Sequence, residues 1–163
     1  MTIAAIDSGL FRRVLRRHAA SVVVVTVPGP VGFTATSFTS VSLNPPLVSF
    51  CVGRGGSAWS SLSATPVVGV HVLTAGQEQV ARVFATPGID RFAAYPGPWH
   101  PGPHGVPLLD GALAVLVCRV ANQVDAGDHA IVVASPVHAW HHDDAEATPL
   151  VYHDGAYTDL GTV

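Results

Sequence analysis

The sequence predicts a mainly β protein: a barrel of strands with a few short helices. Most apolar runs have the length of strands and end at glycine, proline or asparagine, and few stretches show the helical period. The 163 residues are 48% hydrophobic and 12% charged, which is typical of one globular domain with a sizeable core. We therefore treat residues 1–163 as one domain. A barrel is favoured because closure covers strand edges and can enclose one ligand.

The first expected element is a helix over residues 8–18, where apolar side chains recur at helical spacing opposite four arginines. Asp7 or Ser8 can cap it. A buried strand over residues 20–27 follows, and Pro28-Gly29-Pro30 predicts a turn. The further elements expected in this half are strands over residues 32–42, 47–53 and 67–73 and helices over residues 57–64 and 74–84.

Residues 86–107 hold six prolines and four glycines and predict a long irregular loop, of the kind that forms lids or binding loops. Strands are then expected over residues 111–124 and 130–140. The chain closes with two short strands around Asp154-Gly155, a strong signal for a hairpin turn.

Charge and composition disfavour several classes of function. The net charge is −3 and lysine is absent, whereas nucleic-acid binders are usually more basic. No apolar window is long enough to span a membrane, and the first residues lack the pattern of a signal peptide, so we expect a cytoplasmic protein. Low surface charge is consistent with a covered surface, as in a homodimer. The histidines near residue 140 lack the spacing of a known metal site, so no metal is expected.

The two cysteines, Cys51 and Cys118, lie in apolar runs and are expected as free thiols of a reducing compartment. A disulfide or a catalytic thiol is the alternative.

The most informative segment is residues 32–52, where six hydroxyl side chains occur between Thr34 and Ser42 without any charge. Such a row can donate hydrogen bonds to a polyol or a phosphate. It can equally be a half-exposed strand rich in threonine, which is a good strand former. The residues alone leave both interpretations open.

Six motifs occur in order between residues 11 and 161: GFTATSF, SVSLNPPLV, VVGVHVL, PLLDGALAVLVCRV, GDH and PLVYHDGAYTDLG. Together they resemble the flavin reductase family, the short-chain reductase components of two-component monooxygenases. The resemblance implies an FMN-binding split β-barrel with Greek-key-like topology. It also implies hydride transfer from NADH or NADPH to FMN or FAD, a homodimer, and a separate flavin-dependent oxygenase that receives the reduced flavin.

The resemblance also implies site residues. Flavin contacts would come from Gly32, Phe33, Thr34, Thr36 and Ser37 and, largely through the backbone, from Cys51, Val52 and Gly53. The further flavin contacts that it implies are Ser57, Ala58, His71, Arg82 and Phe84. His129, in the Gly-Asp-His turn, would lie beside the nicotinamide and flavin rings as the catalytic residue.

Three positions depart from the family pattern: Ala58 replaces a threonine, Val83 an arginine, and His71 an asparagine. In the family, the threonine and the arginine at the first two of these positions help to hold phosphate. We therefore expect weak phosphate recognition here, with riboflavin competing nearly as well as FMN. Arg82 lies one residue from the usual position, which is about 100° around a helix.

Structural alternatives stay open for four residues. Ser57 can cap a helix, Arg82 can be solvated, His71 can be a core residue, and His129 can be a turn residue bound to Asp128. The corresponding alternatives for the whole protein are a flavin-storage protein with little turnover and an interaction module that binds no flavin.

Overall fold

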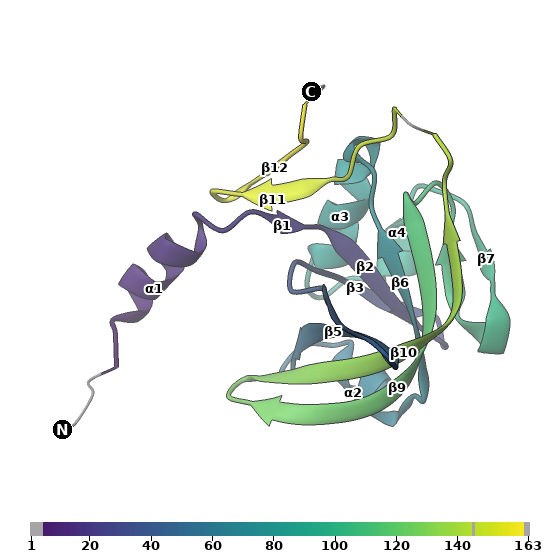
Figure 1. Cartoon of the computed structure of the whole chain (residues 1–163), viewed down its shortest axis with the longest axis horizontal. Coiled ribbons are helices and arrows are strands. Elements are labelled where there is room, and N and C mark those ends of the chain that lie inside the picture. Colours follow the sequence, from purple (N-terminus) through teal and green to yellow (C-terminus); the bar gives the residue numbers. More distant parts are fainter. Residues whose placement is uncertain (1–4, 145, 162–163) are drawn as a thin grey trace.

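A curved seven-stranded sheet forms the body of the molecule (Figure 1). The computed structural model describes residues 5–144 and 146–161. The strand order is β3-β2-β6-β9-β10-β5-β4, and neighbours are antiparallel. The strands are β2 (Val23–Val27), β3 (Val31–Ala35), β4 (Thr39–Leu43), β5 (Pro46–Gly53), β6 (Val67–Val72), β9 (Ala114–Ala126) and β10 (His129–His141). The sheet curls until β3 contacts β5, which confirms a mainly β, split-barrel arrangement.

The hydroxyl-rich segment is not the single strand expected from the sequence. β3 ends at Ala35 and pairs with β2, whereas β4 begins at Thr39 and pairs with β5. β3 and β4 therefore lie at opposite edges of the sheet, and residues 36–38 cross between them. The hydroxyls of Thr36 and Ser37 lie in this crossing segment, away from those on β4.

The expected strand over residues 20–27 is divided at Val22, whose N–H donates to the carbonyl of Leu150. The part before Val22, β1 (Ala20–Ser21), joins a small second sheet with β11 (Val151–His153) and β12 (Ala156–Thr158). The β11–β12 hairpin turns at Asp154-Gly155, as predicted, and both residues have positive φ.

The helices are α1 (Ser8–Leu15), α2 (Trp59–Ala64), α3 (Glu78–Ala85) and α4 (Arg91–Ala94). The capping box of Thr74 and Gln77 is present at the 3₁₀ turn that precedes α3. The segment expected to be irregular contains α4 and a ribbon of β7 (Trp99–Pro101) and β8 (Pro107–Leu109). No helix in the described part of the chain has the length and apolarity needed to cross a membrane.

The core lies on both faces of the sheet, and β2 is buried along its whole length because alternate residues enter different clusters. Val23 and Val25 pack inside the barrel with Phe50. Val24 packs on the outer face with Phe84 of α3. α1 differs from the other elements: none of its residues is buried, and it extends away from the barrel (Figure 1).

Both cysteines are free, as expected. Burial raises the pKa of the Cys118 thiol to about 12, so this thiol stays protonated and unreactive at neutral pH. Cys51 is only partly buried.

Candidate active site

An open cleft of about 800 Å³ lies between α1 and the barrel, at the start of β10. The barrel contributes Thr36, Ser37, Asp128 and His129 to it, α1 contributes Phe11, Arg12 and Leu15, and Arg16 follows directly after α1. The cleft thus brings together three residues expected at the site, Thr36, Ser37 and His129. Its volume is within the range of small-molecule and cofactor sites.

Backbone hydrogen bonds hold the barrel side of this cleft in place. The Oγ of Ser37 accepts from the N–H of Cys51 at 2.8 Å, which fixes the crossing segment to β5. Gly53 pairs with His129 across β5 and β10, and a Cβ on Gly53 would lie 3.8 Å from Nε2 of His129. Because Gly53 has no side chain, β5 leaves its backbone open here, which suits a flat ring such as a flavin.

His129 keeps one ring nitrogen free. Its Nδ1 lies 2.7 Å from Oδ1 of Asp128, and the side chain is 51% exposed. The hydrogen bond to His129 lowers the pKa of Asp128, so this carboxylate is ionised and Nδ1 of His129 carries the hydrogen. Nε2 is then available to a ligand. The hydrogen bond to Asp128 orients the ring and is compatible with both roles considered for His129.

A second pocket of about 260 Å³ contains Gly32, Ser57 and Arg91, and we call it the Arg91 pocket. The Nη1 of Arg91 donates to the carbonyl of Gly32 at 2.8 Å, and its Nε donates to Thr86 at 2.9 Å. Burial lowers the pKa of Arg91, but a guanidinium remains charged at neutral pH. Two of its N–H groups on Nη2 and one on Nη1 remain for an anion. Asp90, whose carboxylate caps α4, also lines this pocket.

Sequence reasoning missed Arg91, although its segment was expected to form a binding loop. The available signal was local: Asp90 is a good N-cap residue directly before it. Recognising α4 would have placed Arg91 at the start of a helix instead of in a loop.

Arg82, the arginine that the sequence favoured, lies elsewhere. Its guanidinium pairs with Glu78 at 2.6 Å and lies 5.1 Å from the ring centre of Tyr157. It lines neither the cleft nor the Arg91 pocket. Its position therefore agrees with the alternative in which Arg82 is a solvated surface residue.

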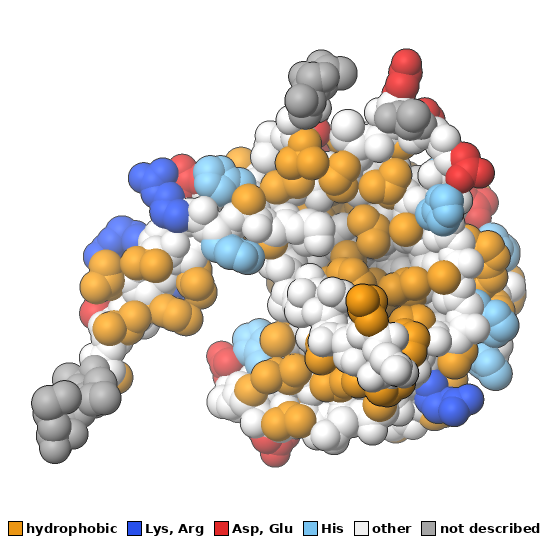
Figure 2. Space-filling model, in the orientation of Figure 1, with side chains coloured by type: hydrophobic (Ala, Val, Ile, Leu, Met, Phe, Trp, Pro, Cys, Tyr) orange, Lys and Arg blue, Asp and Glu red, His pale blue; other side chains and the backbone are white. Residues whose placement is uncertain are grey.

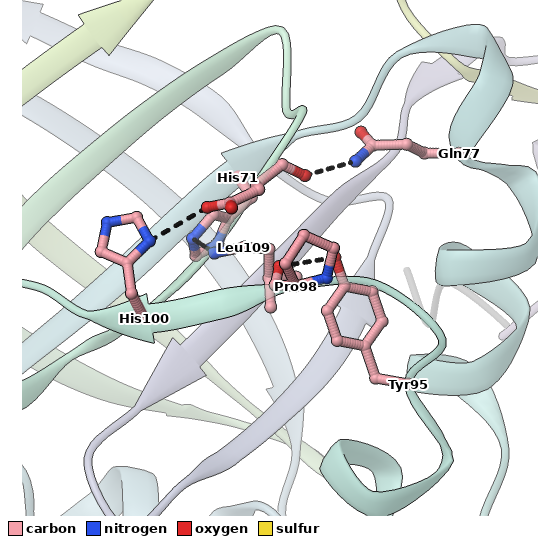
Figure 3. Close-up of polar contacts among 7 residues, drawn as sticks. His71, Gln77, Tyr95, Pro98, His100 and Leu109 are labelled. Carbon is pink, nitrogen blue, oxygen red and sulfur yellow. Dashed lines mark hydrogen bonds and ion pairs between the residues drawn. The ribbon is translucent and has the colours of Figure 1, made fainter.

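His71 is a core residue with both nitrogens in use. Figure 3 shows its ring beside Leu109. Its Nδ1 lies 3.1 Å from the carbonyl of Val24, and its Nε2 accepts from the N–H of Leu109 at 3.1 Å. The two contacts require the neutral tautomer with hydrogen on Nδ1. The fully buried ring has no group left to donate to a flavin, in contrast to the expectation.

The side chains of four other expected residues pack inside the protein. Val52, Ala58 and Phe84 are buried, and Phe33 packs against Phe50 with ring centres 6.2 Å apart. Only the backbone of the three buried residues can serve a ligand, whereas Phe33 is partly exposed.

Two further expected residues face α3. Thr34 uses its hydroxyl to donate to the carbonyl of Ala81 at 2.7 Å. A Cβ on Gly32 would lie 2.8 Å from the Phe84 ring, so glycine is needed there for the helix to approach the sheet.

Among the described residues, no three His, Cys, Asp or Glu side chains converge to hold a metal ion. His141 instead lies 3.4 Å from Asp143 as an exposed pair.

The family of the flavin reductase like domain matches residues 15–161 of this chain. The chain belongs to this family. An NADH:FMN oxidoreductase of Rhodococcus erythropolis is 42% identical over 164 residues, covering 96% of this chain and 85% of the relative. The flavin-dependent monooxygenase reductase subunit HsaB of Mycobacterium tuberculosis is 34% identical over 160 residues, covering 96% of this chain and 84% of the relative.

Solved structures of family members share the fold. The NADH:FAD oxidoreductase of Streptomyces globisporus, in complex with NAD and FAD fragments, superposes with a TM-score of 0.86 at 37% identity. The match covers 96% of each chain. The similarity thus extends across the cleft and the Arg91 pocket.

Proposed function

We propose that this protein is an NADH-dependent flavin reductase, which transfers a hydride from NADH to FMN or FAD. The observation that carries the proposal is the cleft that Ser37 and His129 line, with Gly53 paired to His129 beside it. Family membership and the NADH-dependent activities named for its relatives support it. NADPH is the alternative hydride donor.

The flavin supplies the hydride-accepting chemistry, and the protein supplies binding and orientation. The backbone of residues 51–53 and the hydroxyl of Ser37 hold the ring system along β5. His129, with its Nδ1 fixed by Asp128, presents Nε2 at the rim of the cleft, where it orients the nicotinamide. Ser57 and Arg91 hold the flavin phosphate.

The α1 side of the cleft is basic and suits a dinucleotide. Arg12 and Arg16 line it and make no ion pair within the described part of the chain. Guanidinium groups bind phosphates through charge-assisted hydrogen bonds. These two arginines therefore bind the diphosphate of NADH while His129 orients its nicotinamide.

The functional form that we propose is a homodimer in which α1 packs on a second copy. Leu10, Phe11, Val14 and Leu15 are each 46–58% exposed and form an apolar side of a helix that extends from the barrel (Figure 2). An exposed apolar face of this kind indicates a protein interface. A second copy is the favoured occupant because apolar Val41 and Leu43 on the edge strand β4 are also exposed, 54% and 91%, and offer a matching surface.

A separate oxygenase is the proposed recipient of the reduced flavin, as the M. tuberculosis relative is a reductase subunit of a flavin-dependent monooxygenase. The reaction with NADH also favours the cytoplasm as its location.

Steady-state oxidation of NADH tests the proposed reaction. Purified protein should oxidise NADH only when FMN or FAD is added, with many turnovers per protein chain. Flavin binding without turnover would establish the storage alternative instead. The absence of flavin binding, measured by fluorescence titration, would leave only the interaction module.

Light scattering after size-exclusion chromatography tests the dimer. Phe11→Asp on α1 should convert the dimer to a monomer, because it places a charge in an apolar interface. Arg13→Asp, on the same helix but outside the cleft lining, is the matched control and should stay dimeric. A wild-type monomer would contradict the proposal.

A further inference from the structure

A third cavity, of about 580 Å³, lies at the opposite end of the β9–β10 hairpin from His129. His129 pairs with Ala126 beside the hairpin turn, whereas His141, which lines this cavity, pairs with Ala114 at the other end. No residue is shared between this distal cavity and either the cleft or the Arg91 pocket. It is therefore separate from the proposed reaction site.

The walls of the distal cavity are mostly apolar. Leu108 of β8 and Val115 of β9 line it, and Trp140 of β10 remains 46% exposed beside them. An indole ring left half exposed at an apolar cavity offers a surface on which a planar ring can pack. The shape and chemistry fit an aromatic ligand.

The charge of the cavity excludes most anions. Its described lining residues include no arginine, and the chain has no lysine, whereas Asp110 contributes a carboxylate. A phosphate or a carboxylate would meet this negative group without a permanent cation to compensate it. The cavity is thus unsuited to a second flavin nucleotide or to NADH.

One polar group in the cavity is held in a fixed orientation. Nδ1 of His100 lies 3.0 Å from Oδ1 of Asp110, on the opposite side of the ring from Nε2 (Figure 3). The backbone of Asp110 is held in turn: its N–H donates to Pro98 and its carbonyl accepts from Gln77, each at 3.1 Å. Because the carboxylate accepts the Nδ1 hydrogen, the neutral ring presents a lone pair on Nε2.

We propose that the distal cavity binds a neutral phenol. The aromatic ring packs against Leu108, Val115 and Trp140, and the phenolic hydroxyl donates a hydrogen bond to Nε2 of His100. A hydroxyl donor is required because the oriented imidazole is an acceptor, and a neutral ligand is required because Asp110 repels anions. The proposal does not depend on the proposed flavin chemistry.

Isothermal titration calorimetry with p-cresol tests the proposal. We expect saturable binding of one p-cresol per chain, with the methyl ether of p-cresol and the anion p-toluate each at least tenfold weaker. Equal affinity for the ether would overturn the hydrogen bond, and equal affinity for p-toluate would overturn the charge argument. If p-cresol did not bind to the wild-type protein, the proposed site would be overturned. This includes the case in which a second copy of the chain covers the distal cavity.

Variants locate the binding. His100→Phe keeps the apolar walls and should weaken p-cresol binding at least tenfold, while flavin affinity stays unchanged and reports an intact fold. His153→Phe, at an exposed histidine outside the cavity, is the matched control and should bind normally. Unchanged binding to His100→Phe, or displacement of p-cresol by FMN, would overturn the assignment to the distal cavity.

Discussion

His71 and His129 are both histidines that the sequence put forward as site residues, yet they occupy opposite environments. His71 is fully buried, with one nitrogen on Val24 and the other on Leu109. His129 is half exposed, with one nitrogen on Asp128 and the other free at the cleft. This comparison indicates that a histidine can bind a ligand only where the protein leaves one of its ring nitrogens without a partner.

The largest effect expected from this comparison is acid destabilisation through His71. Burial lowers the pKa of His71 from 6.5 to about 4, although its hydrogen bond to Val24 acts in the opposite direction. As the pH falls below 6.5, His71 binds a proton in the unfolded chain, whereas in the folded protein it does so only near pH 4. The free energy of unfolding therefore decreases over this pH window. The decrease is about 3 kcal/mol, at ~1.36 kcal/mol per pH unit. Urea denaturation across this pH range measures it.

His71→Asn is the matched variant, because an amide can donate and accept hydrogen bonds but does not titrate. Its stability should depend less on pH than that of wild type, whereas His153→Asn should keep the wild-type slope. Identical pH profiles for wild type and His71→Asn would show that His71 is not the source.

The next largest effect is kinetic and concerns His129. His129→Ala should lower kcat/KM for NADH tenfold or more, a loss of ~1.4 kcal/mol of transition-state stabilisation. Its melting temperature should change little, because the side chain is 51% exposed. Asp128→Asn, which weakens the hold on Nδ1, should have a smaller kinetic effect. A variant that melts well below wild type and still turns over normally would make His129 a structural residue.

Most of the fold could be predicted from the sequence because the strand and turn signals are local. Apolar runs and the Asp154-Gly155 turn correctly identified β5, β6, β9, β10, β11 and β12, whereas the β7–β8 ribbon was not expected. The division of the hydroxyl segment could not be predicted, since threonine and serine favour strands throughout it. Only the pairing of β3 with β2 and of β4 with β5 separates its two halves.

The candidate site was less predictable, because it depends on which side chains are buried and on the direction in which each one points. Thr34 and Ser37 have similar side chains in one motif, but Thr34 faces α3 and Ser37 faces the cleft. Arg82 and Arg91 differ in the same way, and the residue types around them do not reveal which one lines a pocket with Ser57. Such distinctions depend on contacts between segments far apart in the chain.

Arg82 and Arg91 provide the next comparison. Because Arg91 lines a pocket with Gly32 and Ser57, we expect FMN to bind about tenfold tighter than riboflavin, where the sequence alone predicted near equality. A charge-assisted hydrogen bond contributes ~1.5–3 kcal/mol, and partial exposure reduces this amount. Arg91→Gln should abolish the preference, whereas Arg82→Gln should keep it. Fluorescence titration of each variant with FMN and riboflavin measures the ratio, and an unchanged ratio in Arg91→Gln would contradict the role of Arg91.

The smallest expected effect separates the hydroxyls of Ser37 and Thr34. Ser37→Ala should weaken flavin binding about threefold, because it removes a donor in the cleft and the acceptor that holds the N–H of Cys51, a loss of ~0.5–1.5 kcal/mol.

Thr34→Val, in contrast, removes the hydrogen bond to Ala81 and should lower the free energy of unfolding by about 1 kcal/mol without changing flavin affinity. Flavin fluorescence and thermal melting of the two variants measure both quantities. If Thr34→Val weakened flavin binding and Ser37→Ala did not, the flavin would lie on the α3 side of β3, and the crossing segment of residues 36–38 would not form its binding surface. The opposite pattern places the ring at the junction of β5 and β10, within reach of the free nitrogen of His129.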